Sequence, residues 1–143
     1  MAYSFRGEIR IWDSDTGKVS KIADGDAPAW SPSGEWIAYL QGTWDPLTNR
    51  IVFEPGRWAP RCIAVRPDGS GKKTLIELRH TKNSSRVLVE PPVWSPDSRS
   101  ILLNELADVD RNTVSIHLLD LQTLKLKTIF RNTIHVAGWA AAE

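Results

Sequence analysis

Hydrophobic and polar residues alternate with a period of two along most of this chain. The stretches "EIRIWD" (8–13), "VSKIAD" (19–24) and "TVSIHLLDLQTLKLKTIF" (113–130) show the alternation most clearly. That period is typical of strands with one buried face. Nine prolines lie between residues 28 and 96, where each one would interrupt a helix. The pattern therefore predicts an all-β fold.

Two segments have almost the same sequence, and a third begins in the same way. They are "AWSPSGEWIAY" (29–39), "VWSPDSRSILL" (93–103) and "VAGWAAAE" (136–143). In each complete copy a Trp-bearing strand leads into a Ser-Pro turn and a second strand, because proline presets the backbone angle that a tight turn needs. Two further strands follow each complete copy, so the repeating unit has four strands.

We label the strands of one unit A to D, beginning with the Trp-bearing strand. The predicted order is then B–C–D, A–B–C–D, A–B–C–D and A, in a single domain over 1–143. Four antiparallel strands in about 40–45 residues are typical of a β-propeller blade. The three predicted blades are 2–23 completed by 134–139, 28–78 and 91–130. Their strands are 2–7, 8–13 and 18–23; 28–31, 36–41, 61–66 and 73–78; 91–95, 100–106, 113–119 and 125–130; and the last strand A, 134–139.

The amino-acid sequence of the repeat resembles the propeller repeat of the TolB-like and WD40-like (PD40-type) family. That resemblance implies propeller blades and covers nearly the whole chain, but it says little about function. The first copy has Ser33 where the family prefers Asp. The second has Asp97 but carries Ser98 in place of Gly, and the third keeps only Gly138 and Trp139.

The repeated tryptophans are predicted to be structural. Trp30, Trp94 and Trp139 occupy the same place in the repeat. A large flat ring fills the widening gap between adjacent blades, and it buries roughly 150–250 Å² of surface. We therefore expect all three rings in the core.

Three blades do not close a propeller, which usually has four to eight. Two copies of the chain supply six blades, so we predict a homodimer with exchanged strands. Strand 134–139 of one copy would complete the unit 2–23 of the other, which assigns assembly roles to Tyr3, Phe5 and Val136. A different oligomer, and a fragment that needs another chain, remain open alternatives.

Composition and charge limit the classes of partner and the cellular location that we expect. The net charge is +1, so no strong field favours nucleic acid or a membrane surface. The single cysteine, Cys62, excludes an intrachain disulfide framework. No signal peptide or membrane span is visible, so we expect a cytoplasmic protein as written, with a periplasmic or excised origin left open.

Catalytic and metal motifs are not found. The three histidines, His80, His117 and His135, are far apart and lack zinc-site spacing. We expect His117 to be a satisfied strand histidine and Cys62 an inert buried thiol. The segment "DSDTG" (13–17) is interpreted as a turn and not as a calcium loop. No cofactor is predicted.

The long connection 42–61 is the candidate binding segment, because long loops in compact domains are often functional. In a propeller it shares one face with the basic loop 79–86, and aromatic and Arg residues are favoured at binding sites. The alternative is that it only pins itself to the blade or forms a short hairpin. Acidic residues on that face, at 24, 26, 108 and 110, argue against nucleic acid. The candidate partner-binding residues are Trp44, Arg57, Trp58, Arg79, His80, Lys82 and Arg86.

The sequence therefore predicts a non-enzymatic propeller scaffold that binds a protein, peptide or small ligand at the loop face and channel mouth. One alternative is a hydrolase or lyase with a site in the central channel between subunits. Another is a bare self-assembling building block with no further activity.

Overall fold

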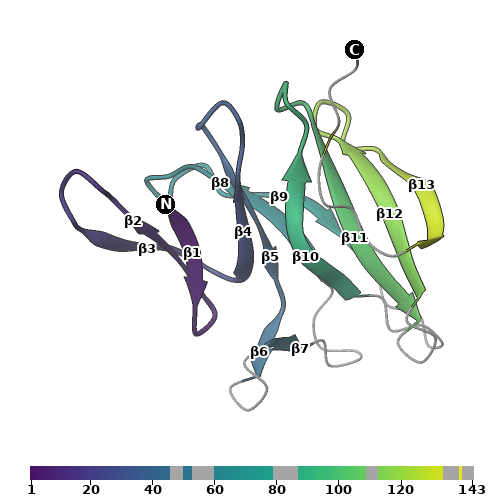
Figure 1. Cartoon of the computed structure of the whole chain (residues 1–143), viewed down its shortest axis with the longest axis horizontal. Helices are drawn as coiled ribbons and strands as arrows, with labels where there is room; N and C mark the ends of the chain where they lie inside the picture. Colours follow the sequence, from purple (N-terminus) through teal and green to yellow (C-terminus); the bar gives the residue numbers. More distant parts are fainter. Residues whose placement is uncertain (46–49, 53–59, 79–86, 109–112, 134–138, 140–143) are drawn as a thin grey trace.

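A computed structural model describes residues 1–45, 50–52, 60–78, 87–108, 113–133 and 139. All regular structure in this part of the chain is β-strand (Figure 1). It contains no helix long and apolar enough to cross a membrane. The strands are β1 (Ala2–Phe5), β2 (Glu8–Trp12), β3 (Val19–Asp24), β4 (Asp26–Trp30), β5 (Ile37–Gln41), β6 (Thr43–Asp45), β7 (Arg50–Val52), β8 (Arg61–Val65), β9 (Lys73–Glu77), β10 (Val87–Trp94), β11 (Ser100–Asp108), β12 (Thr113–Asp120) and β13 (Leu126–Thr133).

Three antiparallel sheets stand side by side along the molecule, from the N-terminal sheet at the left of Figure 1 to the last sheet at the right. Their strand orders are β1-β2-β3, β4-β5-β8-β9 and β10-β11-β12-β13, and a separate hairpin joins β6 to β7. The predicted all-β class and the order B–C–D, A–B–C–D, A–B–C–D are therefore confirmed. Of the last predicted strand only Trp139 is among the described residues, so Val136 lies outside them.

The serine of the repeated Trp-Ser-Pro segment closes the turn between strands A and B. The amide N–H of Ser31 donates to the Trp36 carbonyl at 2.8 Å, and that of Ser95 donates to the Ser100 carbonyl at 2.9 Å. The hydroxyl oxygens then accept the return bonds, from Trp36 N–H at 3.1 Å and from Ser100 N–H at 2.9 Å. The same serine bonds close the A–B turn in both copies, so both copies keep the Trp-Ser-Pro sequence.

Ser98 shows how the second copy tolerates its departure from the repeat. Its φ is +58°, in the left-handed region where Gly34 lies in the first copy. The Ser98 hydroxyl accepts a hydrogen bond from the Ser33 N–H at 3.2 Å, between the turns of two neighbouring sheets. A contact that glycine lacks therefore offsets part of the backbone strain.

The turns between strands C and D use an aspartate. The Asp13 carboxylate accepts bonds from the N–H groups of Asp15 and Thr16, and Asp120 does the same for Gln122 and Thr123. The bond from Thr16, followed by that from Asp15, lowers the pKa of Asp13 below its usual value. Within the described ranges no three potential metal-binding side chains cluster, and 13–17 is a turn.

The sheets are joined by two apolar clusters. The first joint lies between the first and second sheets and contains Ile9, Ala23, Ile37, Tyr39, Ile63 and Val65. The second joint lies between the second and third sheets and contains Ala38, Leu40, Cys62, Ala64, Leu75, Leu78, Leu88, Trp94, Ile101, Leu103 and Leu119. Alternate residues of β5 and β8 serve opposite joints, because side chains of a strand alternate between its two faces.

Candidate functional site

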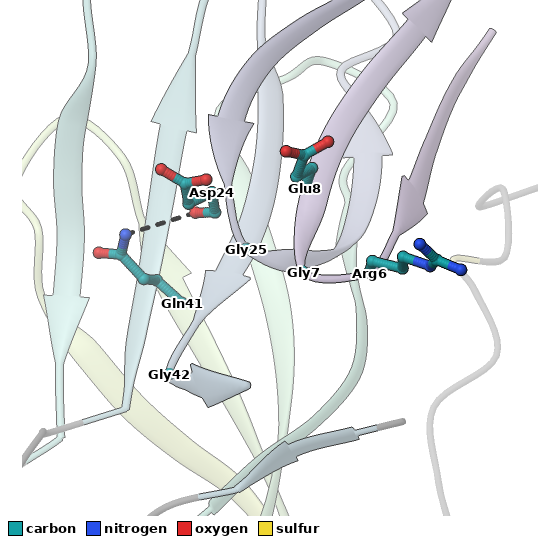
Figure 2. A pocket seen from close by; sticks show the side chains of 7 residues that line it. All are labelled: Arg6, Gly7, Glu8, Asp24, Gly25, Gln41 and Gly42. Atoms are coloured by element: carbon teal, nitrogen blue, oxygen red, sulfur yellow. Dashed lines mark hydrogen bonds between the residues drawn. The ribbon is translucent and has the colours of Figure 1, made fainter. Parts of the chain in front are cut away.

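A pocket of about 310 Å³ opens between the first two sheets, at the end where the B–C and D–A connections emerge. We call this end the loop face. The turn from β1 to β2, the connection from β3 to β4 and the end of β5 meet there (Figure 2). Seven residues line the pocket: Arg6, Gly7, Glu8, Asp24, Gly25, Gln41 and Gly42.

Gly25 fixes the wall of this pocket. Its N–H donates to the Gly7 carbonyl at 2.8 Å, and its φ is +154°. A Cβ atom at this position would lie 2.5 Å from Cδ2 of Tyr39 and 2.6 Å from the Leu40 carbonyl oxygen. Only glycine fits, since real Cβ atoms do not approach neighbours so closely. The Gln41 amide then donates to the Asp24 carbonyl at 3.3 Å across the pocket (Figure 2).

The charges beside the pocket are paired with one another. Arg10 donates to Glu8 at 2.6 Å, and Lys21 lies 3.1 Å from Glu8 and 2.7 Å from Asp24. The bond from Arg10, and then that from Lys21, lowers the pKa of Glu8. Arg6 points away from the other lining residues (Figure 2), and its guanidinium lies 5.2 Å from the Phe5 ring centre. The carboxylates of Glu8 and Asp24 beside the pocket are therefore held by neighbouring cations.

A second group of polar residues is sealed inside the third sheet. Glu105 and His117 are only 1% and 3% exposed, and Glu105 Oε2 lies 2.5 Å from His117 Nε2. Thr128 Oγ1 is hydrogen bonded to His117 Nδ1 at 3.1 Å. The prediction of a satisfied strand histidine is confirmed. The side chains of Glu105, His117 and Thr128 form a chain of hydrogen bonds that joins β11, β12 and β13.

Cys62 is fully buried in the second joint. Burial raises the pKa of its thiol to about 12, so the thiolate is not formed at neutral pH. This agrees with the expectation of an unreactive cysteine.

The predicted partner-binding residues fall largely outside the described part of the chain. Trp44 lies in β6, which pairs with β7 with Trp44 opposite Ile51. The long connection therefore contains the short hairpin that the sequence left as an alternative. The side chain of Trp44 and all of Arg57, Trp58, Arg79, His80, Lys82 and Arg86 lie outside the described residues. The sequence places only Asp24 of the pocket residues on this face; the signal for the others is a glycine directly after each contributing strand.

The three repeat tryptophans differ in burial. Trp94 is 8% exposed, as expected for a ring in the core. Trp30 and Trp139 are 37% and 38% exposed, so the expectation of core burial is wrong for these two within one chain. The physical reason is that Trp30 faces the first sheet, which has no strand A to cover the ring, and that no described strand follows Trp139.

Stacked four-stranded meanders with these joints define β-propeller blades, so the fold is that of a β-propeller segment. Solved structures with this fold include TolB from Acinetobacter baumannii, with a TM-score of 0.60 and 20% identity over 90% of this chain and 30% of that chain. An oligogalacturonate lyase in complex with manganese gives 0.56 and 15% over 87% and 30%. The propeller domain of the Trilobed protease from Pyrococcus furiosus gives 0.55 and 17% over 88% and 34%.

The resemblance to TolB-like propeller repeats is thus confirmed for the fold. The chain spans about a third of the length of these structures. No protein-family profile and no curated protein matches the sequence. The similar structures include TolB, a lyase and the propeller domain of a protease, so they do not assign an activity to this chain.

Proposed function

We propose that this chain is a non-enzymatic scaffold that forms half of a six-bladed β-propeller and binds a peptide, protein or small polar ligand at its loop face. The observation that carries the proposal is the pocket between the first two sheets. Its wall is held by the Gly25–Gly7 bond and by the close packing of Gly25, which is the preorganisation that binding sites need. The predicted residues Trp44, Arg57 and Trp58 belong to connections of the same face and would extend the site.

A non-enzymatic role is supported by the position of the acid–base pair. A general acid or base must reach the proton it transfers within hydrogen-bond distance. Glu105 and His117 are both buried and bonded to each other inside the third sheet. They therefore serve the fold and not a substrate.

Assembly from two copies is supported by aromatic residues that are exposed on the two outer sheets. Phe5 and Trp12 are exposed on the first sheet, and Phe130 is exposed on the third. Alternation places Phe5 and Trp12 on the face that points away from the second sheet, since Ile9 and Ile11 point towards it. Phe130 pairs with Ile116, on the face of the third sheet opposite to Leu119. Exposed aromatic residues at both ends are expected where a second copy completes the ring.

Light scattering coupled to size exclusion tests the assembly. The expected mass is twice the 16.0 kDa of one chain. A folded species with the mass of one chain would contradict the dimer.

Ligand binding is tested by titrating isotope-labelled protein with panels of short peptides, amines and neutral sugars. We expect amide shifts at Gly7, Gly25 and Gln41, and weaker binding in Gln41→Ala and Trp58→Ala. Asp13→Ala is the matched control, because its turn lies at the opposite end of the sheets. Binding that moves only residues remote from the loop face would refute this site.

A further inference from the structure

The two A–B turns of the repeat differ at one position, where the first copy has Ser33 and the second has Asp97. In the second copy Asp97 Oδ1 accepts a hydrogen bond from the Ser95 hydroxyl at 2.6 Å and another from the Arg99 N–H at 3.0 Å. The bond from Ser95, followed by that from Arg99, lowers the pKa of Asp97. The hydrogen bonds of this turn therefore stabilise a negative charge at its second position after the serine.

Ser33 occupies the same place in the first copy with weaker bonds. Its Oγ lies 3.1 Å from Ser31 Oγ and accepts a hydrogen bond from the Glu35 N–H at 3.4 Å. Both distances are longer than their counterparts at Asp97, and a bond of 3.4 Å is weak. The hydroxyl and the N–H that hold a carboxylate in the second copy thus have their equivalents in the first, where a neutral hydroxyl is the acceptor.

Ser33 is exposed and lies against the turn of the next sheet. Its neighbours in the repeat, Ser31 and Ser95, are only 3% and 5% exposed, whereas Ser33 belongs to the exposed residues. The Ser33 N–H donates to Ser98 Oγ at 3.2 Å, between the second and third sheets. An enzyme can therefore reach the Ser33 hydroxyl, and a change at this residue acts on a contact between two blades.

Two arginines flank this turn. Arg66 lies over the ring of Trp36, 4.9 Å from its centre, and Arg99 directly follows Ser98. Both arginines are exposed, and neither forms an ion pair with another residue in the described part of the chain. Because guanidinium groups form strong hydrogen bonds with phosphate, these surroundings suit an added anion.

We propose that Ser33 is a site of phosphorylation, and that its phosphoryl group takes the role that Asp97 has in the second copy. In the reaction Ser33 Oγ attacks the γ-phosphorus of a nucleoside triphosphate held by a serine kinase. An O–P bond forms and the bond from the γ-phosphorus to the bridging oxygen breaks. The nucleoside diphosphate leaves with that electron pair, and the hydroxyl proton passes to a base of the kinase.

The added group strengthens the turn. Its oxygens accept hydrogen bonds from the Ser31 hydroxyl and the Glu35 N–H, as the carboxylate does in the second copy. Since this turn contacts Ser98, phosphorylation stabilises the junction of the second and third sheets. Phosphoserine carries a charge of about −1.5 to −2 at neutral pH and a smaller one below its second pKa of about 6, so the stabilisation is larger at pH 8 than at pH 5.

Phosphoserine introduced at position 33 of the full chain by genetic code expansion tests the role of the group. We expect the melting temperature to rise by about 3 °C at pH 8, and by less at pH 5. The amide resonance of Glu35 should shift, because its N–H gains a charged acceptor. An unchanged melting temperature, or an unchanged Glu35 resonance, would overturn the proposal.

Phosphoserine at position 70 is the matched control. Ser70 is also exposed in a turn, but its N–H already donates to Asp68 Oδ1 at 2.8 Å. A phosphoryl group beside that carboxylate meets a like charge, so the melting temperature should fall. An equal rise at both positions would show that the effect does not come from the place that Ser33 shares with Asp97, and would refute this account.

Access to the hydroxyl is tested with the unmodified protein. It is incubated with magnesium, ATP and a serine kinase that prefers acidic residues after its target, because Glu35 follows Ser33 by two positions. Mass spectrometry should locate phosphate on Ser33, and the signal should be lost in Ser33→Ala. A folded protein that takes up no phosphate at Ser33 would contradict the assignment of this site.

Discussion

Trp30 and Trp94 occupy the same place in the repeat, but only Trp94 is buried. Both rings follow a small or branched residue at the end of a strand A and precede a Ser-Pro turn. Trp94 lies against the second sheet, bonded to Ala29, whereas Trp30 faces a sheet without a strand A. The comparison teaches that the burial of a repeat tryptophan is set by the preceding blade and not by its own sequence.

The largest expected effect comes from removing the buried ring. Trp94→Ala should lower the free energy of unfolding by about 3–5 kcal/mol, because it leaves a cavity in the second joint. Trp30→Ala should cost clearly less in the unfolding of one chain, since its ring is 37% exposed and that of Trp94 only 8%. Urea denaturation at several protein concentrations measures both. Equal losses at low concentration would show that the two joints do not differ.

The next effect concerns the buried pair in the third sheet. His117→Leu removes one partner of buried Glu105 and should cost about 3 kcal/mol. The double variant Glu105→Leu with His117→Leu should be more stable than His117→Leu alone, because no carboxylate then remains buried. Thermal or urea unfolding of the two variants decides the order, and a less stable double variant would refute this account.

A smaller effect, of opposite sign, is expected in the first joint. The Tyr39 hydroxyl is buried and has no hydrogen-bond partner among the described residues. Tyr39→Phe should therefore raise the free energy of unfolding by about 1 kcal/mol. Urea denaturation at neutral pH measures the gain.

The pH dependence of Tyr39 gives a second measurement. Burial, and then the charge of Asp24, raises the pKa of Tyr39 above its usual 10.0. The unfolded chain then releases this proton at a lower pH than the folded chain, so stability falls as pH rises above about 10. The difference between Tyr39→Phe and wild type should widen there. A constant difference would contradict a buried, unpartnered hydroxyl.

The smallest effect concerns the hydrogen bond between the Ser-Pro turns of the two repeat copies. Ser98→Ala removes the bond from Ser33 N–H and keeps the strained φ, so it should cost about 1 kcal/mol. Ser98→Gly loses the same bond and relieves the strain, which is worth about 1 kcal/mol, and should be nearly neutral. Unfolding free energies of the pair measure the contrast. If Gly were as costly as Ala, strain at this turn would be absent.

Much of the fold is predictable because the strand period and turn residues are local. Alternation in 8–12 predicts β2, and the Ser-Pro segments predict the turns after β4 and β10. The sequence did not decide whether the long connection contains the hairpin β6–β7, because a short apolar run in such a connection has several ways to pair. The pocket at the loop face could not be predicted, since it needs Gly7, Gly25 and Gly42 from three separate connections to meet at one end of two sheets.

The sequence by itself determined the strands, their order and the place of Trp30 and Trp94 in the repeat, because period, turn chemistry and repetition act over a few residues. Only the tertiary structure decided that Trp94 is buried while Trp30 is exposed, that Glu105 holds His117, and that Gly25 cannot be anything else. These depend on which strands and sheets stand next to each other, since the hydrogen-bond partners lie 12 residues apart within the third sheet and 65 residues apart between the second and third sheets.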